Sequence, residues 1–270
     1  MSRLRYETIT FPGGPAGWIG LGHSSESPII LIHGFAGDCL TWQFNLGSLA
    51  SQARVIAIDL PGHGRSTREF TGGRIDDFAN WLSCVLDALA APTCHLVGHS
   101  MGGWIALVLA KKQPTRVLSA TVLSCGGLSN CFDLSFLQRV SRLSSFEQAL
   151  DCACALFGDN SLYIESIARG LLVSAENSHI LDMIITDSFI PGLKETPSIS
   201  WSDIKSPLQF IWGDSDVIIP PPSLDRLPPN PLLHRLKGVG HLPHLEAAKI
   251  VNSLILQFIT AQSKSFHVAR

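Results

Sequence analysis

Gly98-His99-Ser100-Met101-Gly102 decides the fold, because it joins two segments of different periodicity. The apolar run at residues 94–97 predicts a buried strand, and residues 103–112 have the spacing of a helix that Pro114 ends. Glycines on both sides of the serine predict a turn too tight for neighbouring side chains, of the kind called a nucleophile elbow. Such a turn would hold the serine hydroxyl out of the sheet.

The segments around this turn alternate short apolar runs with longer amphipathic stretches. This alternation is typical of parallel strands connected by crossover helices. Further strands are predicted at residues 28–32, 54–58, 117–124, 207–212 and 233–239, and further helices at residues 75–89 and 247–261. We therefore expect an α/β fold with a mostly parallel central sheet flanked by helices.

The spacing of apolar residues changes between residues 126 and 200. Residues 136–157 and 162–173 have helical spacing, and no clear strand pattern separates them. We therefore expect a core of residues 1–125 and 201–270, with residues 126–200 inserted as a helical cap.

Composition excludes several classes of protein. The chain has 270 residues, 46% of them hydrophobic, and a net charge of −2, so a large core is expected and a broad nucleic-acid-binding surface is not. We expect no signal peptide, no stable membrane insertion and a cytoplasmic location, since no apolar run is long enough. The seven cysteines lack metal-site spacing, so we expect free thiols in a reducing compartment and no bound metal.

A serine hydroxyl is a poor nucleophile unless a base removes its proton, and the base needs an acid to orient it. Two loops that follow predicted strands offer candidates for both. One loop contains Asp214 and Asp216, and the other contains His241 and His244. The order serine, aspartate, histidine is the one that a nucleophile elbow requires, and the carboxyl ends of parallel strands are where open α/β sheets place their sites.

Over nearly its whole length the chain resembles the α/β-hydrolase superfamily. The resemblance rests on four motifs, which are His33-Gly34-Phe35, the stretch 59–66 (Asp-Leu-Pro-Gly-His-Gly-Arg-Ser), the elbow at Ser100, and the loops of Asp216 and His241. It implies a triad of Ser100, His241 and Asp216. Asp216 is favoured over Asp214 because the family pattern places Gly213 and Pro220 around it, and His241 is favoured over His244 because it directly follows Gly240.

The elbow also implies where a developing oxyanion would be bound. The backbone N–H of Met101, directly after the serine, is one donor by geometry. By resemblance to the His-Gly-x loop of esterases, the second donor is the backbone N–H of Phe35. The expected reaction is hydrolysis of a short to medium acyl ester through an acyl-enzyme, with no metal or organic cofactor.

Two alternatives within the superfamily stay open. The chain is similar to esterases that demethylate pimeloyl-acyl-carrier-protein methyl ester in biotin synthesis, which would make an acyl-carrier protein a partner. Arg139, Arg142 and Arg169 could form a basic face for it, although the cap has more acids than bases. Residues 34–43 also resemble the menaquinone-pathway lyase that forms a succinyl-cyclohexadiene carboxylate. However, His99 and Trp104 replace that enzyme's tyrosine and arginine.

Other chemistries of the superfamily fit less well. Dehalogenases and epoxide hydrolases of this fold have aspartate where this chain has Ser100, and non-catalytic binding members usually lose a triad residue. The partner expected is a small-molecule ester, and its acyl group would lie against Phe35, Trp104, Phe136 and Phe157.

Overall fold

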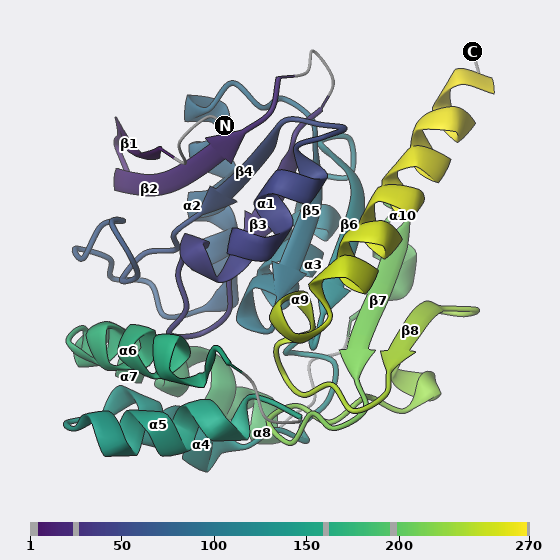
Figure 1. Ribbon diagram of the computed structural model, residues 1–270. Helices are drawn as coiled ribbons and strands as arrows, with labels where there is room; N and C mark the ends of the chain where they lie inside the picture. The colour runs from purple at the N-terminus through teal and green to yellow at the C-terminus, as the bar shows by residue number, and fades with distance from the viewer. Residues whose placement is uncertain (1–4, 24–26, 159–161, 195–198, 269–270) are drawn as a thin grey trace.

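A computed structural model describes residues 5–23, 27–158, 162–194 and 199–268. Its centre is an eight-stranded sheet in the order β1-β2-β4-β3-β5-β6-β7-β8 (Figure 1). The strands are β1 (Tyr6–Phe11), β2 (Gly14–Leu21), β3 (Ile29–Ile32), β4 (Val55–Ile58), β5 (Cys94–His99), β6 (Val117–Leu123), β7 (Leu208–Gly213) and β8 (Leu232–Leu236). Among these described strands only β2 runs against the others, so the predicted α/β fold with a mostly parallel sheet is confirmed.

The middle of the sheet consists of apolar strands covered on both faces. Every residue of β3, β4 and β5 is buried, as expected for parallel strands between two helical layers. Strand β3 pairs with β4 on one side and with β5 on the other, so that Ile32 lies level with both Ile58 and Gly98. The loops that leave β3 and β5 therefore begin side by side, at the point where the strand order reverses.

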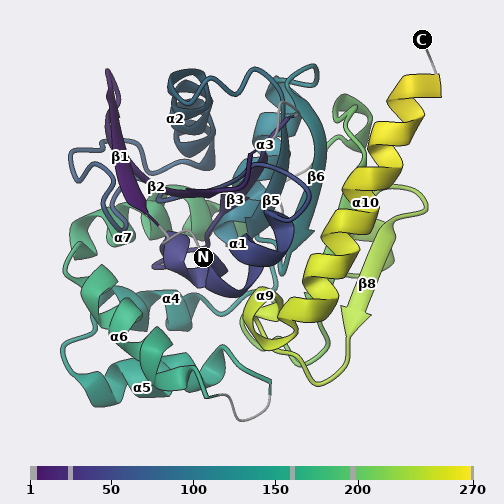
Figure 2. The same cartoon turned by 45° about the horizontal axis from the view of Figure 1, so that its top comes forward.

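Helices cover the two faces of the sheet unequally. On one face, α1 (Gln43–Leu49) and α10 (Ala248–Val268) pack onto the sheet. On the other, α2 (Ile75–Ala88) and α3 (Met101–Lys112) contribute to a larger apolar core. Figure 2 shows the sheet passing between these two layers. Within the described ranges, no helix is both long and apolar enough to span a bilayer.

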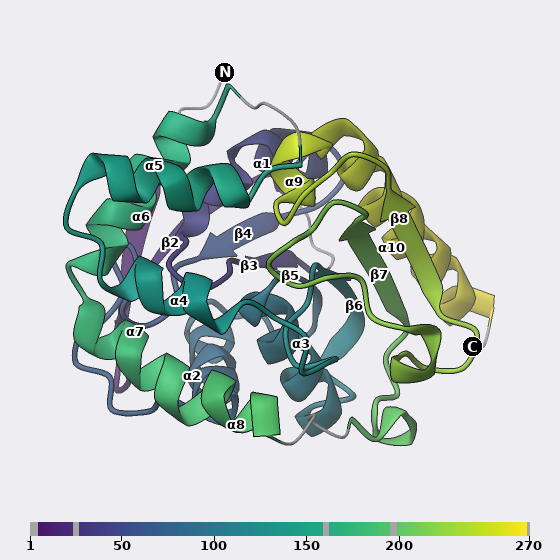
Figure 3. The ribbon, with the colours of Figure 1, turned by 90° about the horizontal axis from the view of Figure 1, so that it is seen from below.

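Between β6 and β7, the described part of the chain forms helices and no strand. The 3₁₀ turn η3 (Trp201–Asp203) leads into β7, and the helices before it are α4 (Leu134–Ser141), α5 (Phe146–Ala155), α6 (Ile164–Ala175), α7 (Ser178–Ile184), the π-helical turn η2 (Ile185–Phe189) and α8 (Ile190–Lys194). They lie across the carboxyl ends of the strands (Figures 1 and 3), and we call them the helical insertion. The division into a core of residues 1–125 and 201–270 and a cap of residues 126–200 stays a prediction.

Three local features differ from the sequence-based expectations. Residues 136–157 form two helices rather than one, because Ser145 starts α5 by accepting a hydrogen bond from the Gln148 N–H at 3.3 Å. The hairpin of β1 and β2 was not expected, and neither was α1. The hairpin forms the edge of the sheet, where pairing with a neighbouring strand decides the structure, and α1 is a seven-residue helix that is held by packing of Leu46 and Leu49 in the core.

Candidate active site

The turn at Ser100 has a backbone conformation that L residues rarely adopt. Ser100 has φ 54° and ψ −116°, directly between β5 and α3. A Cβ on Gly98 would collide with the carbonyl of Gly102, and one on Gly102 would collide with the carbonyl oxygens of Ile32 and His33. The glycines flanking Ser100 are therefore required by the close approach of the elbow to itself and to the end of β3.

The loop after β7 holds one carboxylate in a fixed orientation. Asp216 Oδ1 accepts hydrogen bonds from the N–H groups of Ile218 (3.0 Å) and Ile219 (2.9 Å), and its Oδ2 lies 2.9 Å from His241 Nδ1. Both side chains are buried. His241 Nδ1 therefore donates to Asp216, which leaves Nε2 as the acceptor on the other side of the ring.

The competing candidates have other partners. Asp214 forms an ion pair with Arg235 at 2.6 Å, and both side chains are partly exposed. His244 Nε2 lies 3.0 Å from Thr41 Oγ1, and its ring packs against Trp42 at a centroid distance of 4.4 Å. Of the four alternatives, the structure brings together Asp216 and His241.

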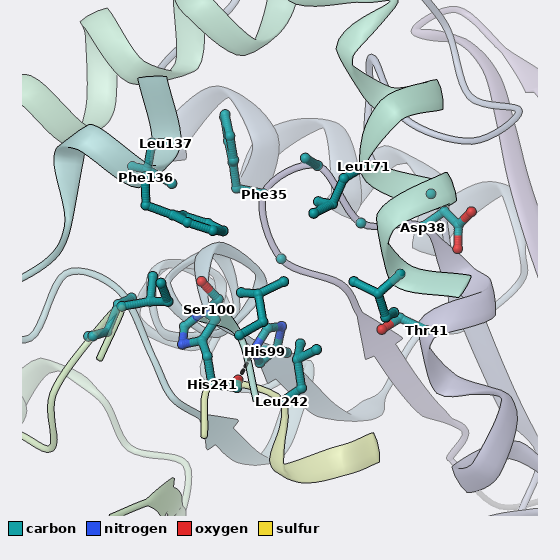
Figure 4. A pocket seen from close by; sticks show the side chains of 18 of the residues that line it. Phe35, Asp38, Thr41, His99, Ser100, Phe136, Leu137, Leu171, His241 and Leu242 are labelled. Carbon is teal, nitrogen blue, oxygen red and sulfur yellow. Dashed lines mark hydrogen bonds between the residues drawn. The ribbon is translucent and has the colours of Figure 1, made fainter. Parts of the chain in front are cut away.

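Ser100 and His241 line one cavity and lie side by side in Figure 4. No hydrogen bond to the Ser100 hydroxyl is found within the part of the chain that the structure describes. Such bonds are often long in the absence of substrate and tighten when it binds.

The cavity has a volume of about 220 Å³ and lies beneath the helical insertion. Apolar side chains form most of its wall, including Phe35, Phe132, Phe136, Leu137, Leu171, Phe189, Ile218, Ile219 and Leu242. Its polar lining includes Asp38, Thr41, Gln43, Asp133 and Ser166. No lysine or arginine is among the described lining residues. The apolar wall and the missing cations suit a neutral, largely apolar ligand.

Two of the four expected substrate-contacting residues line this cavity, namely Phe35 and Phe136. Trp104 does not line it, and its ring packs edge-on against Phe189, a wall residue, at 6.1 Å. Phe157 does not line it either and is buried where its backbone passes Gly240. From the sequence, Phe189 is one of the apolar cap residues that would either line an acyl pocket or pack on the sheet, and the structure places it in the cavity wall, in a π-helical turn of the insertion.

The backbone N–H groups of Phe35 and Met101 border the turn at Ser100. Neither donates a hydrogen bond to another residue within the described ranges. The segment with Phe35 is held by two imidazoles, since His33 Nε2 accepts from the Leu60 N–H at 2.9 Å and His63 Nε2 accepts from the Ala36 N–H at 3.1 Å. The support from His63 was not expected from the sequence, and its only sequence signal is its place between two glycines after a buried strand.

The buried carboxylate of Asp59 joins the loop after β3 to the loop after β4. Asp59 accepts hydrogen bonds at 2.8 Å from the N–H groups of both Cys39 and Arg65, and it also accepts one from the Tyr6 hydroxyl. The loops after β3 and β4 are therefore fixed to one another beside the cavity. Nearby, burial and then the charge of Asp59 raise the pKa of Asp38 to about 6.

Burial keeps four histidines near the cavity neutral. It lowers the pKa of His33 to about 4 and the pKa values of His63 and His244 to about 3. Burial and the neighbouring imidazoles His244 and His241 lower the pKa of His99 well below its usual value. A neutral imidazole offers one donor and one acceptor. His99 uses its Nε2–H to donate to the His241 carbonyl at 2.7 Å.

Among the described residues, no group of three or more histidine, cysteine, aspartate or glutamate side chains is arranged to hold a metal ion.

Comparisons with known proteins agree with this architecture. The family model described as "Alpha/beta hydrolase family" matches residues 29–254. The dihydrolipoyllysine-residue acetyltransferase component of the acetoin cleaving system of Pseudomonas putida is 31% identical over 244 residues, covering 90% of this chain and 66% of that protein. This chain thus spans about two thirds of the length of that relative.

Two further similarities extend over most of both chains. The 2-hydroxy-6-oxononadienedioate/2-hydroxy-6-oxononatrienedioate hydrolase of Burkholderia vietnamiensis is 30% identical over 255 residues, which covers 87% of this chain and 88% of that protein. The crystal structure of a putative lipase from Acinetobacter baumannii superposes with a TM-score of 0.83 at 22% identity, covering 97% of this chain and 93% of the other. The structural similarity supports the fold.

We expect acid to destabilise the protein before most carboxylates are protonated. The four buried histidines near the cavity and His95, whose pKa burial also lowers to about 4, bind protons more weakly in the folded chain than in the unfolded one. The free energy of unfolding should therefore fall as pH drops below about 6.5. Each contributes a slope of about 1.4 kcal/mol per pH unit. Urea unfolding at pH 6.5, 6.0, 5.5 and 5.0 measures the total change in the free energy of unfolding.

The matched variant is His63→Gln, because the glutamine oxygen can still accept from the Ala36 N–H. In this variant, the free energy of unfolding should fall less steeply with decreasing pH than in the wild type, by about 1.4 kcal/mol per pH unit. Identical slopes would mean that His63 is not held neutral.

Proposed function

The chain belongs to the alpha/beta hydrolase family, and from this premise we propose that it is a serine hydrolase that cleaves carboxylic esters. The observation that carries the proposal is the 2.9 Å hydrogen bond between Asp216 and His241 at the cavity that Ser100 lines. A histidine oriented by a buried carboxylate beside a serine in a strained turn is the arrangement that nucleophilic catalysis needs.

In the proposed reaction, Ser100 Oγ attacks the ester carbonyl carbon while His241 Nε2 takes the hydroxyl proton. The tetrahedral intermediate then collapses, the C–O bond to the alcohol breaks, and His241 returns the proton to the departing oxygen. Water attacks the acyl-enzyme by the same route and releases the acid. Asp216 stays ionised and holds Nδ1–H, so that Nε2 remains free to accept.

The intermediate's oxyanion would be bound by the backbone N–H groups of Phe35 and Met101. Their lack of acceptors among the described residues supports this role, because a donor already bonded within the protein would have to break that bond. Donors held in place before the reaction cost no reorganisation, and each typically contributes about 3 kcal/mol to transition-state stabilisation.

The substrate that the cavity supports best is a neutral ester with a short to medium acyl group. Its wall is largely apolar and includes no lysine or arginine within the described ranges. A cavity without cations is poorly suited to the dioate in the name of the Burkholderia vietnamiensis relative, or to the polyanionic substrate of the menaquinone-pathway lyase.

The carrier-protein alternative has weaker support. Two of the three arginines proposed for a basic face already interact with neighbours, since Arg139 lies 3.9 Å from Asp133 and Arg169 lies over the Phe146 ring at 4.8 Å. The Asp133 carboxylate partly offsets the charge of Arg139, whereas Arg169 keeps its charge; the excess of acids in the insertion opposes an acidic partner as well. We therefore favour simple esters over a pimeloyl-carrier methyl ester.

Replacing Ser100 tests the nucleophile. We expect Ser100→Ala to lower kcat for p-nitrophenyl esters of two to eight carbons by about 10⁴-fold or more. Thermal unfolding followed by circular dichroism checks that the variant is folded. Serine-dependent hydrolysis of a pimeloyl-carrier methyl ester in preference to every simple ester would instead favour the carrier-protein alternative, and hydrolysis that survives the substitution would exclude Ser100.

The two neighbouring aspartates allow a matched test of the acid. Asp216→Asn should lower kcat by about 10⁴-fold, because an amide at this position disfavours the histidine tautomer that the mechanism needs. Asp214→Asn, which breaks a partly exposed ion pair with Arg235, should leave kcat within about twofold of the wild type. The reverse pattern of losses would assign the acid to Asp214.

Substrate charge tests the cavity. Monoethyl adipate has nearly the same length as ethyl hexanoate but ends in a carboxylate. We expect its kcat/KM to be lower by about 100-fold or more, because the apolar wall offers no partner for the anion. Titration of the released acid at constant pH measures both rates, and equal rates would contradict the proposed substrate class.

A further inference from the structure

The opening of the cavity can be located from the exposure of its lining. Ser100, His241 and most of the apolar wall are buried. Among the described lining residues, the exposed ones belong to two segments. Leu40 and Gln43 lie where the 3₁₀ turn η1 (Cys39–Trp42) passes into α1, and Ser166 and Gly170 lie on α6. The cavity therefore meets solvent between α6 and the η1–α1 segment. Figure 4 labels Leu171 of α6 together with Asp38 and Thr41 of the other segment.

This opening has a fixed edge at each end of α6. At the start of the helix, the ring of Tyr163 packs against that of Phe44 in α1, with centroids 4.7 Å apart. Near its last turn, Ser174 Oγ donates a 2.8 Å hydrogen bond to the carbonyl of Ala36. The helix thus contacts the core at both ends, and the residues between these contacts border a window.

Gly170 lies inside this window, and its backbone conformation does not require a glycine. It is in the middle of α6, outside the positive-φ region. A glycine in a helix interior is unfavourable relative to alanine, because it restricts the unfolded chain less. A Cβ built on Gly170 would meet no atom within 4 Å, so packing does not exclude a side chain either. What glycine provides here is open space at the mouth of the cavity.

The polarity of the lining indicates which half of an ester would lie in the window. The interior is apolar and suits an acyl chain, whereas Asp38, Thr41, Gln43 and Ser166 lie at or beside the opening. An alcohol group that extends into solvent would pass these polar side chains at little desolvation cost.

We propose that Gly170 keeps the window between α6 and the η1–α1 segment open for the alcohol half of the ester, and so sets the size of leaving group that the enzyme accepts. This inference rests on the proposed ester hydrolysis. A side chain at position 170 would narrow the window without touching Ser100, His241 or Asp216, so its effect should depend on the alcohol and not on the acyl chain.

The test is a graded series, Gly170→Ala, Gly170→Leu and Gly170→Phe, assayed on three esters. Ethyl butanoate is the small reference, 2-naphthyl butanoate enlarges the alcohol, and ethyl octanoate enlarges the acyl group. We expect Gly170→Phe to lower kcat/KM for the naphthyl ester by about tenfold or more relative to ethyl butanoate, with Gly170→Leu intermediate. The ratio of ethyl octanoate to ethyl butanoate should stay unchanged.

Gly47 supplies the matched control. It is an exposed glycine in α1 whose Cβ would likewise meet nothing within 4 Å, and it does not line the cavity. Gly47→Phe should leave all three ratios unchanged. Equal losses on all esters, a loss that follows acyl length, or no loss in the Gly170 series would overturn the proposal.

Failure of the underlying function is separable from failure of the window. If the wild type shows no Ser100-dependent hydrolysis of any of the three esters, the proposed function is wrong. The window is then tested by the association rate of 2-naphthol with the wild type and Gly170→Phe, followed by fluorescence. A slower rate in the variant supports the window, and equal rates overturn it.

Discussion

The conformation of Ser100 is the constraint on which the site depends. A residue with φ 54° and ψ −116° needs surroundings that hold it in place, and here a fully buried strand precedes it and a helix follows. Gly98 lets the turn fold tightly against the start of α3, and Gly102 lets it approach the end of β3 so closely that no side chain fits between them. The same approach brings the loop of Phe35 beside the serine. The proposed nucleophile and oxyanion donors therefore depend on one packing event, the pairing of β3 with β5.

Neutral imidazoles hold the loops around that turn. His33 and His63 each accept a hydrogen bond from a backbone N–H, and His99 donates one to the carbonyl of His241. A protonated ring could not accept, so the arrangement requires the low pKa values that burial produces. In a site of low dielectric, such satisfied bonds orient a loop rigidly. The same burial makes the support sensitive to acid.

The helical insertion forms part of the cavity wall and is connected to the loop of His241. The His241 N–H donates to the Leu156 carbonyl at 2.8 Å. Glu246 accepts from the N–H groups of Gly158 and Gly240, both at 2.9 Å, so one carboxylate joins the insertion to the histidine loop. Together with the contacts at the two ends of α6, these bonds hold the apolar wall over Ser100. In the proposed function, the insertion would select which substrates reach Ser100, which the sheet positions.

The sequence by itself determined the fold and the turn at Ser100. Buried apolar strands, glycines and helix spacing are encoded within a few neighbouring residues, and steric exclusion at such a turn is local. The residues alone left both Asp214 and Asp216 as candidates, and the family resemblance favoured Asp216. Only the tertiary structure shows which carboxylate meets His241, because the contact depends on how two loops 25 residues apart fold against each other. The hairpin of β1 and β2, the support from His63 and the choice of which apolar cap residues line the wall were likewise decided by packing between distant segments. The break at Ser145 is different, because it rests on a local cap between Ser145 and Gln148. The window at Gly170 belongs to the same group, since a glycine in a helix has no functional meaning until the surface facing it is known.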